Sequence, residues 1–529
     1  MRSCAFLLFA LSLSSSCFAQ GVDLRKLYNL YVHLPKLVAT TDALADKDGL
    51  HANTYADLSV LILDHTDLRL RYEHMTRPLP GFDSNFAGHG FAHVSLSQSV
   101  NEKFSYVLGD VYEQFGSGAA LRLYEDRTLG IDGSLRGGEM TLELTNFELK
   151  ALAGRQRCYW KHNKSVVWGA EVSCPITDVL GSETTSVSVS GFYVGRRERS
   201  QEDIMVSTNE RLRLPTLLAH FGGQVSINSS GFAAQLEGVV RSQDPSRDNN
   251  YTYGRGNCFS AWVSLSKSGR SLVFQARRNY NMSVRSRRSD TGNASMLNHL
   301  PPFSMQHTAS LMALRPYATQ TLGEWAFQVE ARRKMTKDCR LDIHFSHIRG
   351  LLGKEGGGEP LGSDGLKPSV FKTRELYFQD FNVRLAKMVE QMTFDVMYSY
   401  QKYAQATIEN HGEPMIDSHI VLLEGCFPLS SVLTLRTELQ GLMASCGGNW
   451  LAALVELSVA PKIMFSAQDM WNASGTEGNF YRVGIAYTGL LGRLAAGYGK
   501  TRAGYNCSGG VCRFVPQTEG AYIQMTFNP

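Results

Sequence analysis

The densest group of residues capable of chemistry lies between positions 109 and 136. Glu125, Asp126 and Arg127 are adjacent, and Arg122 and Arg136 lie near them in the sequence. Paired carboxylates can act as general acid and base, but neighbouring guanidinium groups keep them ionised, which favours a structural or gating network. Adjacent strand residues point to opposite faces, so either these side chains diverge or the segment folds inward as a loop.

Two other patterns are similar to known kinds of active site. Gly116 and Gly118 are spaced as in a nucleotide-binding loop, but the strand-then-helix context is missing. His344 and Asp342 share one face of a predicted strand and could form a surface dyad, although a hydrogen bond inside a lumen is the favoured interpretation. The cysteine spacing does not suggest zinc. We therefore predict no enzyme and no cofactor or metal site.

The N-terminus predicts export through the Sec pathway. Arg2 supplies a positive start, residues 5–11 are apolar, and small residues precede a cleavage site at Gln20, so 1–19 is the predicted signal peptide. Without Arg2 the 53 basic residues become 52, against 49 acidic ones, and the mature charge is 52 − 49 = +3. This charge is too small to predict nucleic acid as a partner.

Eight of the ten cysteines remain after cleavage, in a compartment where they can oxidise. Cys507 and Cys512 flank a Ser-Gly-Gly turn and are the best predicted disulfide. The sequence leaves the other connectivities open. Two further pairs could staple hairpins, namely Cys158 with Cys174 and Cys426 with Cys446.

Apolar and polar residues alternate at period two along most of the mature chain. Leu68 and Leu70 fall on one face of such a segment, and Arg69 and Arg71 fall on the other. This period predicts strands with one apolar face. The segments are roughly 9–13 residues long, which matches the strands that cross a bilayer, whereas no apolar run approaches the roughly 20 residues of a membrane helix.

Short turns alternate with long polar loops, as in outer-membrane barrels. We predict an all-β fold with a single large antiparallel transmembrane β-barrel over 51–529, of roughly 22–26 strands, with short periplasmic turns and long outer loops. The alternation of turns and loops breaks once, near 282–322, which indicates a miscounted strand. Residues 20–50 are predicted to be an N-terminal segment that could tuck into the lumen and is too short for the plug domain of an energised importer.

Charged side chains on the strands are assigned to the lumen, because Arg or Lys facing lipid at mid-depth costs about 2–4 kcal/mol. A structural lining of ion pairs is favoured over a selectivity constriction. The predicted lumen residues are Arg69, Arg71, Arg122, Glu125, Asp126, Arg127, Arg136, Glu330, Arg332, Arg340, Asp342, Arg436 and Glu438.

Five short segments spread over the mature chain are specific as a set. They are Y-E-Q-F-G-S-G (112–118), E-D-R-T-L-G-I-D (125–132), G-R-Q-R (154–157), P-Y-A-T-Q (316–320) and C-S-G-G-V-C-R-F-V-P (507–516). With them the chain resembles a family of uncharacterised, predicted outer-membrane β-barrels of Gram-negative, Bacteroidota-type bacteria. The resemblance implies location and fold, and it implies no activity. The final Asn528-Pro529 departs from barrels that end on the aromatic residue itself.

The favoured function is a channel or porin-like passive transporter of an unspecified solute in the outer membrane. The main alternative is a surface or secretion-machinery scaffold with a blocked lumen, whose long outer loops bind protein partners. An outer-membrane hydrolase and a soluble secreted β protein are less favoured. Outer-membrane lipid is the expected partner, and the solvated run 285–288, Arg-Ser-Arg-Arg, could contact anionic lipopolysaccharide.

Overall fold

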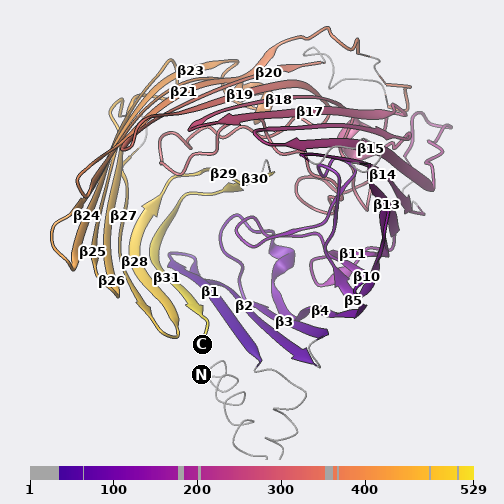
Figure 1. Cartoon of the computed structure of the whole chain (residues 1–529), viewed down its shortest axis with the longest axis horizontal. Helices are drawn as coiled ribbons and strands as arrows, with labels where there is room; N and C mark the ends of the chain where they lie inside the picture. The colour runs from indigo at the N-terminus through magenta and orange to yellow at the C-terminus, as the bar shows by residue number, and fades with distance from the viewer. Residues whose placement is uncertain are drawn as a thin grey trace, which may run out of the picture.

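A closed antiparallel barrel dominates the computed structural model (Figure 1). The main sheet has 25 strands, and the two-residue β12 (Lys161–His162) only extends β11, so 25 − 1 = 24 strands form the wall. The prediction of a single large antiparallel barrel of roughly 22–26 strands is confirmed. The structure describes residues 35–62, 65–176, 184–199, 204–351, 361–365, 368–475, 478–508 and 511–529. The predicted signal peptide, 1–19, lies outside the described residues.

The wall strands follow one another around the barrel in chain order. They are β1 (Lys36–Asp46), β2 (Gly49–Ile62), β3 (Thr66–Met75), β4 (Gly88–Asn101), β5 (Phe104–Val111), β10 (Leu135–Leu144), β11 (Phe147–Cys158), β13 (Val166–Pro175), β14 (Thr185–Arg197), β15 (Leu217–Ser229), β16 (Phe232–Arg241), β17 (Gly256–Lys267), β18 (Arg270–Tyr280), β19 (Gly323–Thr336), β20 (Cys339–Gly350), β21 (Leu376–Val389), β22 (Met392–Tyr403), β23 (Ile416–Pro428), β24 (Leu433–Ala444), β25 (Trp450–Val459), β26 (Ile463–Asn472), β27 (Phe480–Gly489), β28 (Gly492–Thr501) and β31 (Thr518–Phe527).

The remaining elements are short and lie in the connections. They are β6 (Gln114–Phe115), β7 (Leu121–Arg122), β8 (Glu125–Asp126), β9 (Ile131–Asp132), β29 (Gly504–Ser508), β30 (Val511–Val515), η1 (Ser84–Phe86), η2 (Arg247–Asn249) and α4 (Gln405–Ile408). Among the described residues, no helix is long and apolar enough to cross a membrane.

The two ends of the barrel differ in their connections. At the turn end, where β1 begins and β31 stops, hairpins close with pairs of residues such as 102–103, 145–146 and 337–338. At the loop end the longest connections are 281–322, between β18 and β19, and 351–375, between β20 and β21. Tyr280 pairs directly with Gly323, so 281–322 is one long connection without a wall strand, and this explains why the predicted alternation of turns and loops broke there.

The two faces of the wall have opposite polarity. On β19 and β20, Phe327 and Phe345 point outward and are exposed, whereas Glu324 and His344 point inward and are buried. The same outward exposure holds for large apolar side chains of nearly every strand, including Leu108, Phe221, Leu236, Phe259, Leu439 and Ile523. Period-two alternation thus positions an apolar belt outside and a polar surface inside, as predicted.

The wall begins earlier than the sequence suggested. Strand β1 lies within the predicted N-terminal segment 20–50, yet it pairs along its length with β2 and, from Ala39 to Asp46, with β31. The predicted boundary at residue 51 is therefore wrong. Its sequence, KLVATTDALAD, alternates small apolar and polar residues too weakly to stand out as a strand.

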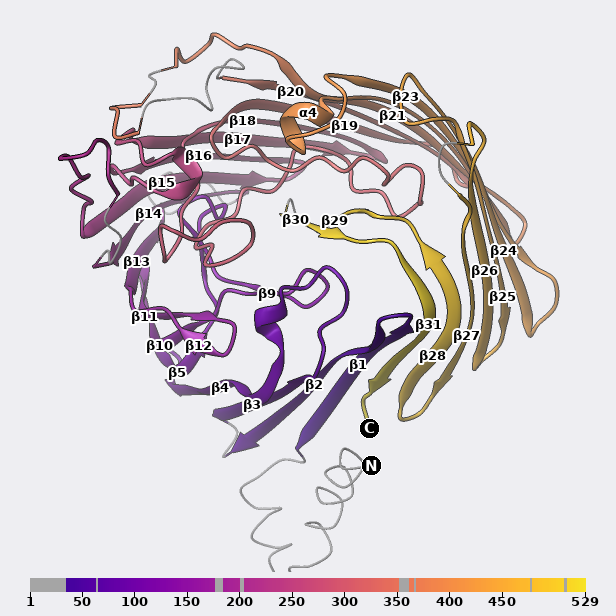
Figure 2. The same ribbon diagram turned by 180° about the vertical axis from the view of Figure 1, so that it is seen from behind.

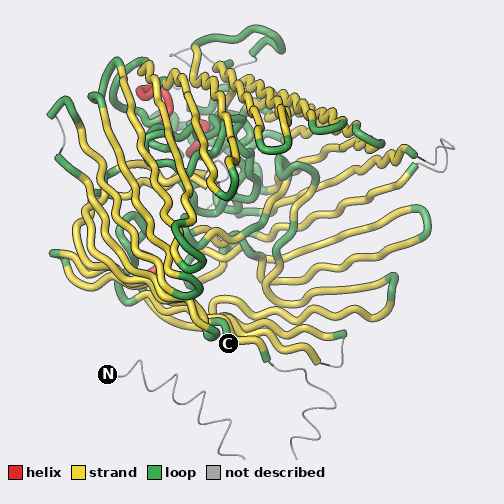
Figure 3. The backbone as a smooth tube through the Cα atoms, turned by 60° about the vertical axis from the view of Figure 1, so that its left-hand side comes forward, coloured by secondary structure: helices red, strands yellow, loops and turns green. Residues whose placement is uncertain are grey.

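Three connections from the loop end fold into the ring of strands (Figures 2 and 3). We name them the first inward segment (112–134, carrying β6–β9), the long inward segment (281–322) and the terminal hairpin (504–515, β29 and β30). Four clusters of buried apolar residues pack these segments against the inner wall and against one another. The largest joins the first and long inward segments to β10–β17.

Candidate functional site

The first inward segment begins with a docked turn. Phe115 is fully buried in the largest apolar cluster. Gly116 has φ +55°, a left-handed conformation that favours glycine. This turn aims both the backbone N–H and the hydroxyl of Ser117 at the carboxylate of Glu237 on β16, with both donor–acceptor distances 2.5 Å. The turn that contains Gly116 and Gly118 therefore contacts the wall of the barrel through Ser117.

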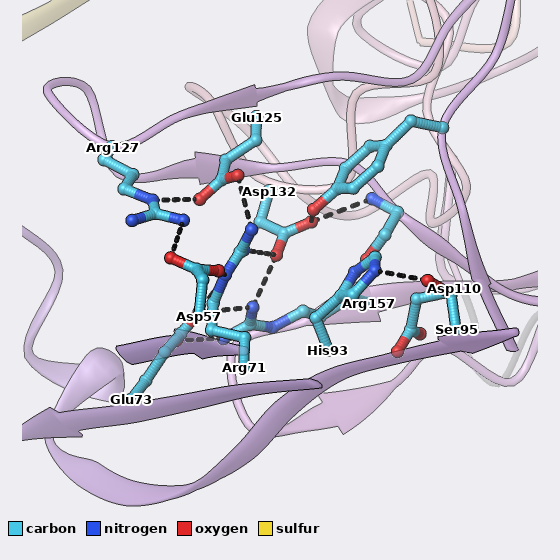
Figure 4. Close-up of polar contacts among 12 residues, drawn as sticks. Asp57, Arg71, Glu73, His93, Ser95, Asp110, Glu125, Arg127, Asp132 and Arg157 are labelled. Atoms are coloured by element: carbon cyan, nitrogen blue, oxygen red, sulfur yellow. Dashed lines mark hydrogen bonds and ion pairs between the residues drawn. The ribbon is translucent and has the colours of Figure 1, made fainter. Parts of the chain in front are cut away.

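An ion-pair network holds the second half of this segment to β2 and β3 (Figure 4). Arg71 Nε lies 2.7 Å from Asp57 Oδ1, and its Nη2 lies 2.7 Å from Glu125 Oε2. Arg127 on the segment spans the same two carboxylates, 2.8 Å from Asp57 and 2.6 Å from Glu125. Two guanidinium groups and two carboxylates thus form a closed ring between wall and segment.

Arg157 at the loop end of β11 extends the network. Its Nη2 lies 2.6 Å from Glu73 Oε2, and its Nη1 contacts Asp132 Oδ2. Asp132 also accepts a hydrogen bond from the hydroxyl of Tyr112, at 2.9 Å. Burial alone would raise the pKa of Asp132, but Arg157 and hydrogen bonds from Ser134 hold it below its usual value, so Asp132 is ionised at neutral pH.

The network joins three guanidinium groups to four carboxylates, a balance of 3 − 4 = −1. Arg71, Glu73 and Arg157 are buried, and the other four side chains are partly buried. A buried pair of this kind contributes little net stability over an apolar replacement, yet removing one partner leaves an uncompensated charge and costs about 3–5 kcal/mol. The network therefore fixes the position of the first inward segment against β2 and β3. Each of the four carboxylates of the network is ion-paired with at least one of its guanidinium groups.

The other predicted residues of this region have separate partners. Arg136 makes two 2.7 Å contacts with the buried carboxylate of Asp110 on β5. Asp126 accepts from the backbone and hydroxyl of Thr128 and so stabilises the turn within the segment. Arg122 lies over the ring of Tyr124, with 4.9 Å between Cζ and the ring centroid.

The long inward segment follows the inner wall from β18 to β27. Phe303 and Tyr317 pack against β19–β22, and Leu311 and Met312 pack against β22–β27. Polar contacts fix its register, because the backbone N–H of Leu311 donates to Gln440 Oε1 at 2.8 Å and Arg315 Nη1 donates to Ser418 Oγ at 2.7 Å. This segment adds a second layer to the wall and narrows the lumen.

The basic run 285–288 belongs to this packing. Arg285 contacts Asp248, and Arg288 Nε lies 3.1 Å from Glu198 Oε2, with both guanidinium groups buried. The prediction of a solvated face is therefore wrong for these residues, because the segment folds inward; Arg287 alone in the run has an exposed side chain. Contact with lipopolysaccharide stays a prediction.

The predicted charged residues of β3, β19, β20 and β24 lie on the inner face towards the turn end. Arg436 is held by Glu424 and Glu456, each at 2.7 Å, and by Glu438 at 3.0 Å. The other contacts are also between near neighbours, namely Arg69 with Asp67 at 2.7 Å, Arg332 and Arg340 with Asp342 at 2.9 and 3.0 Å, and Glu330 with Gln328 at 2.6 Å.

Exposure of the inner face rises steadily from the loop end to the turn end. On β19, Glu324 is 0% and Gln328 is 6% exposed, whereas the Arg332 side chain is 61% exposed. The neighbouring β20 shows the same change from Ser346, which is fully buried, to Arg340. The inner face is therefore open to solvent near the turn end and covered by the inward segments near the loop end.

The predicted pair of His344 and Asp342 does not form. Asp342 is paired with arginines, and His344 instead contacts Ser346 Oγ at 3.3 Å and lies 3.5 Å from Asp380 Oδ1. This serine, histidine and aspartate set is covered by the long inward segment, and Ser346 has no exposed surface for a substrate carbonyl to reach. No group of three or more potential metal ligands occurs in the part of the chain that the structure describes.

His307 makes the docking of the long inward segment sensitive to pH. Burial lowers the pKa of His307 to about 4, so the docked imidazole is neutral, and its Nε2 has no described partner. A detached segment would titrate near pH 6.5. Docking is therefore at full strength above pH 6.5 and weakens as pH falls towards 4.

We expect hydrogen exchange of residues 303–315, corrected for intrinsic rates, to increase between pH 7 and pH 4.5. His307→Gln removes this titrating group and should reduce the increase in exchange between the two pH values. The same pH dependence in the variant would show that another group controls docking.

The cysteines are distributed differently from the predicted pairs. Cys507 and Cys512 form a disulfide that closes the terminal hairpin. The two further suggested pairs, Cys158 with Cys174 and Cys426 with Cys446, are free thiols. They cannot bond because the partners of each pair lie towards opposite ends of the barrel.

Thiol counting tests this pattern. Maleimide labelling of the unfolded mature protein should find six thiols before reduction and eight after it. Four thiols before reduction would reveal a second disulfide and contradict the described arrangement.

Several residues of the site were absent from the sequence prediction. They are Asp57, Glu73, Asp132, Arg157 and Glu237. Asp57 and Glu73 occupy inward positions of alternating strands, so a strict application of period two could have found them. Asp132 and Arg157 lie in two of the five short segments that are specific as a set, 125–132 and 154–157. Their pairing joins residues far apart in the sequence, so it has no local signal.

A closed antiparallel wall with an apolar outer face and a polar, ion-paired inner face defines the class of integral outer-membrane β-barrels. Short turns and both ends of the wall on one side, with long connections on the other, are the usual arrangement of periplasmic and outer ends. Within this class, the chain belongs to DUF6029, a family of unknown function, which it matches over residues 1–528.

Solved structures with a related shape include transporters and receptors. The translocation pore of the P pilus usher PapC has 9% identity and a TM-score of 0.43, with 94% of this chain and 99% of that chain covered. The siderophore receptor PirA from Pseudomonas aeruginosa has 10% identity and a TM-score of 0.43 (94% and 80% covered), and the copper transporter OprC has 10% and 0.42 (93% and 80%). No curated protein matches the sequence.

Proposed function

We propose that the protein is a passive channel of the outer membrane whose conductance is limited by its inward segments. The observation that carries the proposal is the gradient of exposure along the inner wall. Ion pairs with exposed arginines line the turn-end half, which is typical of a water-filled lumen. The loop-end half is covered by packed segments, which would leave only a narrow path.

The packing of the inward segments supports a constant constriction. Apolar clusters join them to the wall over most of the circumference from β10 to β27. A segment fixed in this way narrows the pore without moving, so small conductance with few voltage-dependent closures is the expected behaviour.

Charge at the turn end supports a preference for anions. A hollow of about 1170 Å³ beside the turns of β15–β22 is lined by seven basic and two acidic residues, which are Lys267, Arg270, Arg332, Lys334, Lys337, Arg340 and Lys387, with Asp338 and Asp395. Clusters of Arg and Lys at a pore favour entry of anions.

Planar-bilayer recording of the purified mature protein tests the proposal. We expect discrete single-channel steps and, in a KCl gradient, a reversal potential of the sign that chloride permeation gives. A heat-modifiable band on gels would establish that the recorded protein is folded. Folded protein without conductance would contradict the channel and favour the alternative, a scaffold with a blocked lumen that binds partners through its outer loops.

A further inference from the structure

A cavity of about 260 Å³ lies at the loop end, where the three inward segments meet. The connection between β3 and β4 and the loop end of β11 complete its lining. Aromatic rings form part of the lining, including Phe82, Phe86 and Tyr124. The volume is slightly below the usual range for drug-sized ligands, so it suits a smaller molecule.

Buried polar atoms without partners line this cavity. Arg513 Nε and Nη1 lack an acceptor, and Gln156 Oε1 lacks a donor, among the described residues. The hydroxyl of Tyr124 is likewise without a partner in that part of the chain. A buried polar group left without a partner destabilises the fold. A molecule that supplies acceptors to the arginine and donors to the amide oxygen would satisfy all three.

Positive side chains outnumber negative ones in the lining of the cavity. No carboxylate of the described residues forms an ion pair with Arg122 or with Arg513. The guanidinium Cζ of Arg513 lies 3.8 Å from the centroid of the Phe82 ring. The lining carboxylate of Asp132 is held by Arg157 of the network. The remaining one, Asp83, accepts a hydrogen bond from a tyrosine hydroxyl at 2.6 Å. Asp126, outside the lining, attracts Arg513 electrostatically, and within the lining these two guanidinium groups face this single carboxylate, which favours an anion.

We propose that this cavity binds a small hydroxylated organic carboxylate of monosaccharide size, such as a hexuronate. The carboxylate would accept hydrogen bonds from Arg513 and be attracted by the charge of Arg122. Ring hydroxyls would donate to Gln156 Oε1 and exchange a hydrogen bond with Tyr124, and the apolar face of the ring would pack on the aromatic lining. An inorganic anion satisfies only the arginines, and a neutral sugar satisfies only the other groups. The proposal does not depend on whether the lumen conducts.

A free thiol in the cavity reports on its occupancy. Cys158 lines the cavity, and Cys446, in the loop-end connection between β24 and β25, is a free thiol elsewhere that serves as internal control. The folded mature protein is alkylated in detergent with D-glucuronate, D-glucose or inorganic phosphate, and each peptide is followed by mass spectrometry. A Kd of about 1 mM predicts that about 10 mM glucuronate slows modification of Cys158 about tenfold. Cys446 should react at an unchanged rate.

Matched substitutions locate the effect. Arg513→Gln should abolish protection by glucuronate, whereas Arg332→Gln, which removes an exposed arginine of β19 outside the lining, should retain it. Heat-modifiable mobility must be the same for both variants and the parent. Absent protection, equal protection by glucose or by phosphate, or protection that persists in a folded Arg513→Gln variant would each overturn the proposal.

Discussion

Replacing residues 283–320 by a short Gly-Ser turn is expected to raise single-channel conductance at least about twofold. The long inward segment forms a second layer along the inner wall between β18 and β27, so its removal widens the lumen. The barrel itself should still close, because Tyr280 and Gly323 are direct partners at the ends of β18 and β19, and a short turn can join them. Bilayer recording of the folded variant measures the change.

The control for this replacement is a shortened connection that does not enter the lumen. Residues 205–211 form an exposed tip between β14 and β15 and suit this purpose. Their replacement by the same linker should leave the conductance unchanged. Equal conductance of the 283–320 variant and the parent would show that the segment does not limit the current.

Arg157→Gln is expected to release the first inward segment from the wall. The side chain is buried and holds Glu73 and Asp132, so its loss leaves two carboxylates without their main counter-charge, at a cost of about 3–5 kcal/mol. We expect trypsin to cleave the folded variant after Arg127, while the parent protein resists cleavage there. Peptide mapping after brief digestion measures the difference.

Arg69→Gln provides the matched control, because Arg69 also lies on the inner face but its side chain is 65% exposed and forms an ion pair with Asp67. Such a pair contributes at most about 1 kcal/mol, so cleavage after Arg127 should stay at the parent level. If the Arg157 variant were as resistant as this control, the network would not be what holds the segment.

The barrel could be predicted from sequence because its main signal is local. Alternation such as Leu68-Arg69-Leu70-Arg71 fixes the strand and its two faces without knowledge of distant residues. The exception, β1, is made of small and polar residues, and its identity as a wall strand follows from pairing with β31 across almost the whole chain. The alternation of residues within β1 does not indicate that it pairs with β31.

The candidate site was less accessible to prediction because its contacts are long-range. Glu125 and Arg127 were recognised as charged neighbours, but their wall partners, Arg71 and Asp57, lie 54 and 70 residues away in the sequence. The run at 285–288 gave a misleading prediction because basic residues are usually solvated, and only the inward fold supplies Glu198 and Asp248 as partners. The cavity of Arg513 and Gln156 depends on five separate stretches and has no local signature.

The seam between β1 and β31 imposes an order on assembly. The edge of β1 has no partner until residues 520–527 arrive, so the wall stays an open sheet until the entire chain has been delivered. The first and long inward segments leave the wall far upstream of that seam and must already lie on the concave side when the last strand is added. A chain that stops before residue 518 would therefore retain two unpaired edges, those of β1 and β28, and a bilayer does not tolerate such edges. The ten residues of β31 thus decide whether the preceding sheet can remain in the membrane.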